Sequence, residues 1–272
     1  MGNDAPTSGL RSGADDDDSK YITIIDHDSD VGYLFPYSHN YYQQDTGIAN
    51  LIFKPDQPQV LEKLSNHIKE YPDIINSIYY VEDEYKTCGT LLFFACKFCP
   101  HSSYDIIRLL IELGSDVNYK NNTNTTPLMY AVMWTGKIKH IHIVELLMKY
   151  GAKINDSNNM GNTPLIFACR NSTTTSSVEC IEYLLNNGAH VNDQNESKTT
   201  PLMEVIQNNH FEAAVYLVNK NADCKLINDQ GRSVYDIIKL TPKNKNRRKL
   251  KMLLNCVSKK PVQYYSNILG FT

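Results

Sequence analysis

The sequence has little that would support catalysis or membrane insertion. No window approaches the roughly 20 apolar residues of a spanning helix, and residues 1–20 are polar and acidic, unlike a secretory signal. There is no phosphate-binding glycine loop, no nucleophile-elbow serine and no His-Glu metal helix. The seven cysteines are an odd number spread through apolar runs, which favours buried thiols over a disulfide scaffold. We therefore expect a non-enzymatic protein of the cell interior, without a cofactor or a metal.

A repeat dominates what is present. Thr126-Pro127-Leu128, Thr163-Pro164-Leu165 and Thr200-Pro201-Leu202 recur at a spacing of 37 residues. Thr90-Leu91-Leu92 stands 36 residues before the first, and Ser233-Val234-Tyr235 stands 33 after the last. Self-similarity at such a period is typical of stacked repeats, so the sequence predicts five units with the same supersecondary structure.

Each unit carries the signals of two helices. A Thr before Pro is a good N-cap, and Pro suits the first helical position because it lacks the N–H that would be unpaired there. Leu two positions after each Thr is expected inside the stack, and so is the small residue at position five, which is Ala95, Ala131 or Ala168. A second helix with apolar residues at i, i+3 and i+4 then ends at a left-handed residue, namely Gly114, Gly151, Gly188 or Asn221.

The second-helix exits identify a resemblance. The segments 151–155 and 188–192 have the pattern Gly-Ala-x-Val/Ile-Asn before a loop that returns to Thr-Pro-Leu or its counterpart, and the segments 114–118 and 221–225 are variants of it, Gly-Ser-Asp-Val-Asn and Asn-Ala-Asp-Cys-Lys. From Cys88 to Ile238 the chain resembles the ankyrin repeat. The resemblance implies an all-α repeat solenoid, an array of helix-turn-helix units with β-hairpin loops.

We expect the following organisation along the chain. A disordered acidic arm (1–20) and an aromatic segment of unknown structure (21–57) precede an N-terminal half repeat or cap (58–87). The repeats then occupy 88–123, 124–160, 161–197 and 198–230, followed by a C-terminal capping repeat (231–258) and a tail (259–272). The second and third units have four more residues than the family pattern, which we place between their helices, in 136–142 and 171–177.

The resemblance also implies where a partner binds, because ankyrin repeats use hairpin tips and the exposed face of the first helix. Carried onto this sequence, the positions of the four repeats and the last hairpin are Phe98; Asn122, Thr123, Thr125, Met133 and Trp134; Asn159, Met160, Asn162, Arg170 and Asn171; Glu196, Ser197, Thr199, Gln207 and Asn208; and Asp229, Gln230 and Arg232.

Trp134 is the only tryptophan and falls at the solvent-facing end of a first helix. Trp and Arg are enriched in interface hot spots, so Trp134 with Phe98, Met133 and Arg170 is a candidate anchor cluster. The alternative is that Trp134 packs under the inserted segment 137–142. Both interpretations stay open at this point.

Three weaker patterns have simpler explanations. Cys96 and Cys99, with His101 and Cys88, have thiolate spacing suited to zinc, but there is no second pair at finger spacing. Residues 26–32 alternate carboxylates, yet they lack the glycine and glutamate of an EF-hand loop. His140 and His142 are expected to be solvated or capping residues. We favour a core cysteine, a solvated acidic arm and no metal.

Charge is segregated in the last part of the sequence. Residues 239–272 contain nine basic residues and no acidic ones, whereas the remainder has a net charge of −12. The segment could act in nuclear import or touch nucleic acid. We favour a capping helix with a solvated outer face, because Leu250, Leu253 and Leu254 are spaced to pack on the last repeat.

These features together predict a protein–protein interaction scaffold or adaptor, a monomer that takes no small-molecule substrate and contacts no membrane. The alternatives are a substrate-targeting subunit of a ubiquitin ligase and a nuclear or nucleic-acid-associated factor. The 27 Asn, 23 Ile and 18 Tyr resemble ankyrin proteins of giant amoeba-infecting DNA viruses. That resemblance implies a host-encoded or self-encoded partner protein and a place in the host cytoplasm, with the nucleus as the other compartment.

Overall fold

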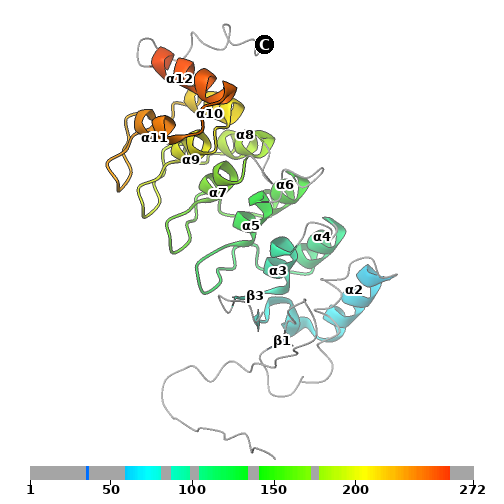
Figure 1. Ribbon diagram of the computed structural model, residues 1–272. Helices are drawn as coiled ribbons and strands as arrows, with labels where there is room; N and C mark the ends of the chain where they lie inside the picture. Colours follow the sequence, from blue (N-terminus) through cyan, green and yellow to red (C-terminus); the bar gives the residue numbers. More distant parts are fainter. Residues whose placement is uncertain are drawn as a thin grey trace, which may run out of the picture.

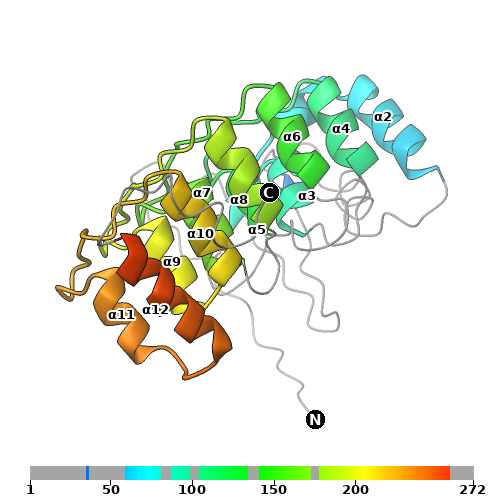
Figure 2. The same ribbon diagram turned by 90° about the horizontal axis from the view of Figure 1, so that it is seen from above.

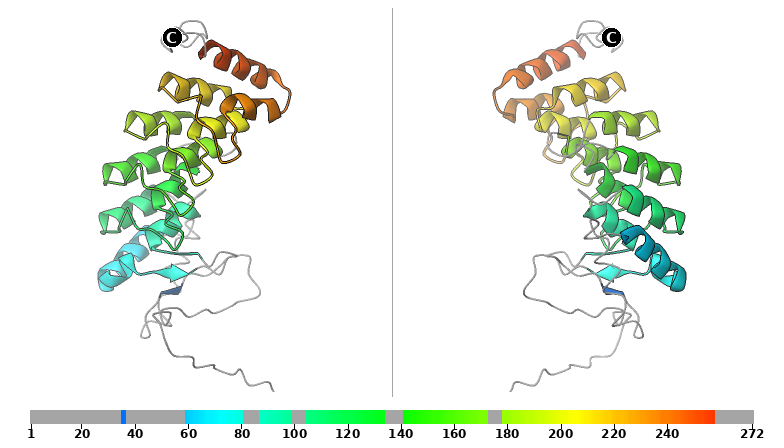
Figure 3. Two further views of the ribbon diagram at one scale, coloured as in Figure 1. Left: turned by 90° about the vertical axis from the view of Figure 1, so that its left-hand side faces the viewer. Right: turned by 90° about the vertical axis from the view of Figure 1, so that its right-hand side faces the viewer.

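Pairs of helices follow one another along the chain and stack in single file (Figures 1 and 3). The computed structural model describes residues 35–36, 59–80, 87–98, 104–133, 141–172 and 178–257. The inner layer holds α3 (Leu91–Lys97), α5 (Pro127–Met133), α7 (Pro164–Arg170), α9 (Pro201–Gln207) and α11 (Val234–Leu240). The outer layer holds α4 (Tyr104–Glu112), α6 (Ile141–Lys149), α8 (Val178–Asn186), α10 (Phe211–Asn219) and α12 (Lys245–Val257).

Each helix contacts the next helix of its own layer, and Figure 2 shows the two layers from above. The loops that join one pair to the next all project from the same side of the stack (Figure 1). This is the all-α repeat array that the sequence predicts. Neighbouring helix pairs form the core together, since a single pair cannot bury its apolar face alone.

The N-terminal end is closed by one further helix. Within the segment expected to be an N-terminal half repeat or cap lies α2 (Val60–Glu70), which packs against α4 in the outer layer. It is followed by a 3₁₀ helix, η1 (Pro72–Asn76). A small antiparallel sheet lies below α3, with the order β1 (Phe35–Pro36), β2 (Tyr79–Tyr80) and β3 (Cys88–Gly89). Apart from Phe35 and Pro36, the expected arm and aromatic segment, with the carboxylates of 26–32, lie outside the described residues up to residue 58.

The start and end signals act as predicted. The hydroxyls of Thr90, Thr126, Thr163 and Thr200 accept a hydrogen bond from the backbone N–H three residues on, at 3.2–3.4 Å. Ser233 begins α11 with a capping box instead. The second helices end at residues with positive φ, which are Gly114 (99°), Gly151 (87°), Gly188 (95°) and Asn221 (65°). Local hydrogen bonds and backbone conformation therefore fix the start of the first helix and the end of the second helix in each repeat.

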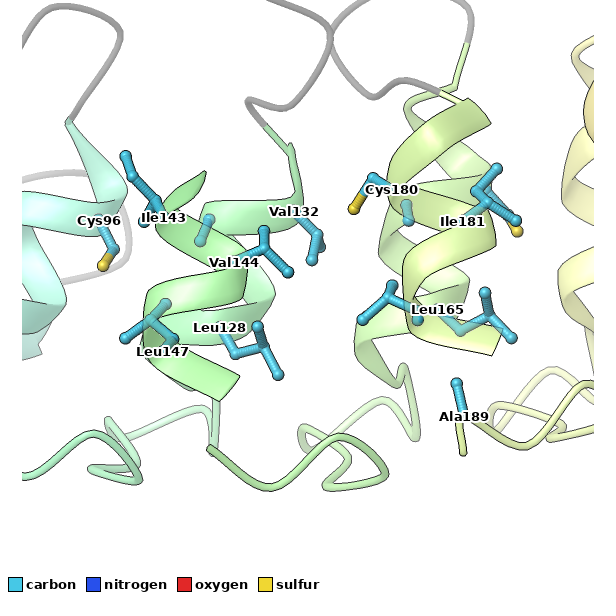
Figure 4. Close-up of a cluster of buried hydrophobic side chains, with 14 of the residues drawn as sticks. Cys96, Leu128, Val132, Ile143, Val144, Leu147, Leu165, Cys180, Ile181 and Ala189 are labelled. Atoms are coloured by element: carbon cyan, nitrogen blue, oxygen red, sulfur yellow. The ribbon is translucent and has the colours of Figure 1, made fainter. Parts of the chain in front are cut away.

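One continuous apolar core runs through the stack. The leucines after each cap and the small residues at position five are 0–3% exposed, as expected: Leu92, Ala95, Leu128, Ala131, Leu165, Ala168 and Leu202. Val205 takes the place of the alanine in α9 and is also fully buried. Figure 4 shows one stretch, where Leu128 and Val132 of α5 lie beside Val144 and Leu147 of α6.

The extra residues of two repeats fall between their helices. Helix α5 ends at Met133 and α6 begins at Ile141, whereas α9 ends at Gln207 and α10 begins at Phe211. A similar interval separates α7 from Val178, the first residue of α8. The insertions expected in 136–142 and 171–177 lie mostly outside the described residues; of the remainder, residues 141–142 differ from the expectation because they begin α6, and residues 171–172 follow α7. Because the helices on both sides keep their places in the layers, the insertions leave the stacking intact.

Candidate functional site

The projecting loops owe their shape to one asparagine each. The side-chain oxygens of Asn121, Asn158, Asn195 and Asn228 accept backbone N–H groups of their own loop, four residues on in every case and also two residues on in three of them, at 2.8–3.1 Å. The backbone N–H of the same asparagine donates to the carbonyl four residues on, at 3.0–3.2 Å. Each loop is therefore a closed hairpin turn. The sequence reasoning missed these asparagines, although their recurrence before each Thr was visible.

Successive hairpins are joined through their backbones. Asn159 N–H donates to the Thr123 carbonyl at 2.9 Å, and Glu196 N–H donates to the Met160 carbonyl at 3.0 Å. Asp229 N–H continues the row to Ser197 at 3.0 Å. Gly161 has a φ of 70°, and a Cβ there would lie 2.9 Å from the Glu196 backbone nitrogen. Only glycine allows this close approach, so the row of tips is a defined surface.

A second row of asparagines joins the exits of the outer helices. Asn76, Asn118, Asn155 and Asn192 each donate from the side-chain amide to the carbonyl of the next exit residue, at 3.0–3.4 Å. Each also accepts the backbone N–H two residues further on, at 2.7–3.1 Å. The paired bonds fix how each repeat is placed on the previous one, and so set the positions of the hairpins.

The last two hairpins and the inner helices beneath them enclose a groove of about 500 Å³. Leu240 at the end of α11 is 65% exposed there, and the Arg232 guanidinium donates to the Gln230 side chain at 2.7 Å. Six of the predicted contact residues meet in this groove, which is lined by Ser197, Thr199, Gln207, Asn228, Asp229, Gln230, Arg232, Ile237, Leu240, Thr241 and Pro242.

Two of the predicted contact residues differ from the expectation because they are buried. Thr125 is 6% exposed, and its N–H and hydroxyl bond Asn121 and Thr123 within the hairpin. Asn162 is 2% exposed, and its side-chain oxygen accepts from Arg170 and Asn195. Both side chains shape the hairpins and do not face a partner. They stand one residue before the helix cap, where the chain turns back into the stack.

The tips and inner-helix ends hold most of the other predicted positions. The exposed ones are Asn122, Thr123, Asn159, Met160, Glu196, Ser197, Gln207, Asp229, Gln230 and Arg232. Asn171, Thr199 and Asn208 are half-buried, and Asn208 donates to the Arg170 carbonyl at 2.6 Å. Met160 is the most exposed apolar side chain of the tips, at 65%. That these residues contact a partner stays a prediction.

Arg170 is held by the next repeat. Its Nε and Nη2 donate to one carboxylate oxygen of Glu204 at 3.1 and 2.8 Å, and Nη2 also reaches Asn162 at 3.0 Å. The Glu204 side chain is 10% exposed, whereas that of Arg170 is 40% exposed. The ion pair therefore joins α7 to α9 and leaves part of the guanidinium at the surface.

The other members of the suggested anchor cluster lie at the ends of neighbouring inner helices. Phe98 follows α3, is 37% exposed and stacks on Phe94 with ring centroids 5.8 Å apart. Met133 is the last residue of α5 and is half-buried. Trp134 lies outside the described residues, so both interpretations of it stay predictions.

The described residues contain no group of three or more His, Cys, Asp or Glu side chains that could hold a metal ion. Cys96 is 1% exposed in α3, as a core residue would be, while Cys99, His101 and His140 lie outside the described part. His142 is in the first turn of α6, 2.9 Å from Glu145. Burial, with Glu204 nearby, raises the pKa of the Cys169 thiol well above its ordinary value. A buried thiol of this kind is inert.

The predicted cap on the last repeat is present. Leu250, Leu253 and Leu254 of α12 are 0–3% exposed, and α12 contacts both α10 and α11. Among the helices of the described ranges, none is long and apolar enough to cross a bilayer.

Comparison with known proteins gives the family. A search of curated proteins found no match. A family model described as ankyrin repeats (3 copies) matches residues 67–158 and 139–228, which together cover more than half of the chain. The matched region begins in α2 and ends in the last hairpin, so it includes both asparagine rows. The chain therefore belongs to the ankyrin-repeat family, whose repeats indicate a protein–protein interaction domain.

Proposed function

We propose that this protein is a non-enzymatic adaptor that binds a partner protein through its hairpin tips and the face of its inner helices. One observation carries the proposal: the groove beside α9 and α11 gathers six residues chosen from the sequence as contacts. Its lining combines amides, hydroxyls, one guanidinium and an exposed leucine. That mixture suits a polypeptide, which offers backbone hydrogen bonds and apolar side chains together.

Preorganisation supports the same proposal. The hairpins are closed by their asparagines and bonded to one another, so a partner would not need to order them. Binding to fixed loops avoids the free-energy cost of immobilising them. We infer that the array acts as a rigid platform and works as a monomer, with a host or self-encoded protein as partner, in keeping with the compositional resemblance to viral ankyrin proteins.

A matched pair of variants tests the groove. Leu240 in α11 and Met252 in α12 are 65% and 66% exposed, but only Leu240 lines the groove. We expect Met252→Ser to keep every protein that the wild-type chain captures from a lysate, as identified by mass spectrometry. Leu240→Ser with Gln207→Ala should lose at least one of them by about tenfold or more, the effect of a hot-spot truncation. Identical captured sets for the two variants would contradict the proposal.

The basic end of the chain supports one other candidate, a nuclear or nucleic-acid-associated factor. Arg248 is exposed, whereas Arg247 is 9% exposed and bonds the Lys239 carbonyl, so reversal of Arg248 alone tests the charge without breaking the cap. A change of compartment or of salt-dependent DNA binding in Arg248→Glu would favour that candidate. The ubiquitin-ligase alternative requires a ligase component among the captured proteins.

A further inference from the structure

A second groove, of about 670 Å³, lies where α11 turns into α12. Among the residues that the structure describes, its lining contains five lysines or arginines and no carboxylate: Lys243, Asn244, Lys245, Arg247, Arg248 and Lys251. Within the ranges that the structure describes, none of these cations forms an ion pair. By contrast, Lys239 is 2.9 Å from the Asp236 carboxylate. The groove therefore concentrates positive charge that the fold itself does not neutralise.

Arg247 gives this groove a fixed cation. Its side chain is 9% exposed, and its Nη2 donates to the Lys239 carbonyl at 2.7 Å. Its Nε is buried and has no hydrogen-bond partner in the described part of the chain. A buried guanidinium N–H without an acceptor is costly. Because Arg247 belongs to the groove lining, an anion in the groove would lie near this planar, always-charged group, which binds carboxylates well.

The basic groove continues the first one along the chain. Thr241 and Pro242 line the groove beneath the hairpins, and Lys243 begins the lining of the basic groove. Because the two linings adjoin at Pro242 and Lys243, a bound segment that passes Leu240 and Pro242 would come next to the basic groove. The hairpin groove has one cation and one carboxylate, Arg232 and Asp229, whereas the basic groove has five cations.

We propose that the basic groove is an anion subsite of the protein-binding surface, which receives the carboxylates of an acidic segment in the partner. The inference rests on the proposed function, since the same segment lies across the hairpin groove. Charge complementarity of this kind sets partner choice and the association rate. The partner is thus a protein with apolar residues followed by a run of Asp or Glu.

The lining of the two grooves favours a polypeptide over nucleic acid. A nucleic acid carries phosphates along its whole length, so it would bring them against the Asp229 carboxylate and the exposed Leu240 in the first groove. Among the residues that the structure describes, neither lining contains an aromatic side chain on which a base could stack. The cations are concentrated in the basic groove, as expected for a segment whose charge lies at one end.

Synthetic probes test the subsite directly. The first is a fluorescein-labelled peptide in which Leu-Ser-Gln-Leu precedes six glutamates, and the second replaces the glutamates by glutamines. The third is a labelled DNA duplex of about 12 base pairs, compared at an equal concentration of negative charge. Fluorescence anisotropy with the full chain should show the glutamate peptide binding about tenfold tighter than the glutamine peptide at low salt. The difference should shrink as salt rises to about 150 mM, where exposed charges are screened.

Arg248 and Lys249 provide the matched variants. They are neighbours in α12 and both exposed, but Arg248 lines the basic groove, whereas the Lys249 ammonium lies 5.0 Å from the Phe211 ring centroid. Arg248→Glu and Lys249→Glu change the net charge equally. We expect Arg248→Glu to weaken the glutamate peptide by about tenfold and to leave the glutamine peptide unchanged. Lys249→Glu should change both affinities by less than about threefold, because only the general charge is altered.

Three results would overturn the subsite: equal affinity for the two peptides, an equal loss in both variants, or tighter binding of the duplex than of the glutamate peptide. The outcome is separable from the proposed function. Partners that depend on Leu240 but not on Arg248 would leave the adaptor function standing without the subsite. Glutamate selectivity with no partner that depends on Leu240 would leave the subsite standing without the adaptor function.

Discussion

The row of asparagines at the helix exits predicts a measurable coupling between repeats, and Asn155 lies at its centre. Asn155 donates to the Gly188 carbonyl at 3.0 Å and accepts the His190 N–H at 3.1 Å. The substitution Asn155→Ala removes both bonds, together with an exposed contact of 3.2 Å between the amide and the His190 ring. Since a hydrogen bond contributes about 0.5–1.5 kcal/mol net to the free energy of unfolding, the loss of the two bonds corresponds to about 1–3 kcal/mol. Because the side chain is only half-buried and water can replace the lost partners, we expect about 1–1.5 kcal/mol.

Urea denaturation followed by circular dichroism measures this loss, and Ser157→Ala provides the control. Ser157 is exposed and forms no side-chain hydrogen bond with any residue that the structure describes. Hydrogen exchange adds a local reading, because the His190 amide should lose protection only in Asn155→Ala. A loss of stability equal to that of the control, or an unchanged His190 exchange rate, would refute the idea that the row couples the repeats.

Three further predictions concern single groups in α7 and α9. Thr163→Ala removes the cap that accepts the Ile166 N–H and should cost about 1 kcal/mol in urea denaturation, whereas Thr163→Ser should cost less. Arg170→Ala leaves the largely buried Glu204 carboxylate without its cation, so it should lower the free energy of unfolding by about 1–3 kcal/mol. The double variant with Glu204→Gln should recover part of this loss. If the effects of the two single substitutions simply added in the double variant, the ion pair would not contribute to stability. Folding raises the pKa of the Cys169 thiol, so above the ordinary thiol pKa the folded state binds more protons than the unfolded state. The free energy of unfolding should therefore fall as pH rises above about 8.5. The thiol should also resist alkylation by iodoacetamide until urea is added, as measured by mass spectrometry.

The local signals of the repeat could be predicted from the sequence because each has its cause within a few residues. An N-cap hydroxyl accepts a hydrogen bond from the backbone N–H three residues on, so Thr90, Thr163 and Thr200 predicted where their helices begin. Asn221 could replace glycine because asparagine tolerates a positive φ, which is 65° here. The family resemblance then supplied the order of stacking, which no local rule contains.

The shape of the candidate surface was harder to predict, because it depends on contacts between repeats. Thr125 and Asn162 follow the family positions for contact residues, yet bonds to Asn121 and Arg170 keep them inside. The hairpin groove requires residues from two loops and two inner helices at once. The spacing of residues within one repeat does not give the distance between loops of different repeats. The sequence therefore predicted six residues of the groove but not the groove itself.

Asparagine shows most clearly how composition and structure meet in this chain. The chain contains 27 asparagines. Eight of them form the two rows, at 76, 118, 155 and 192 and at 121, 158, 195 and 228, each with an amide in hydrogen-bond contact with backbone groups. An amide both donates and accepts, so it can join two repeats where a carboxylate could only accept. The row at the helix exits ends where Lys225 replaces the next asparagine, and there α12 covers the stack instead.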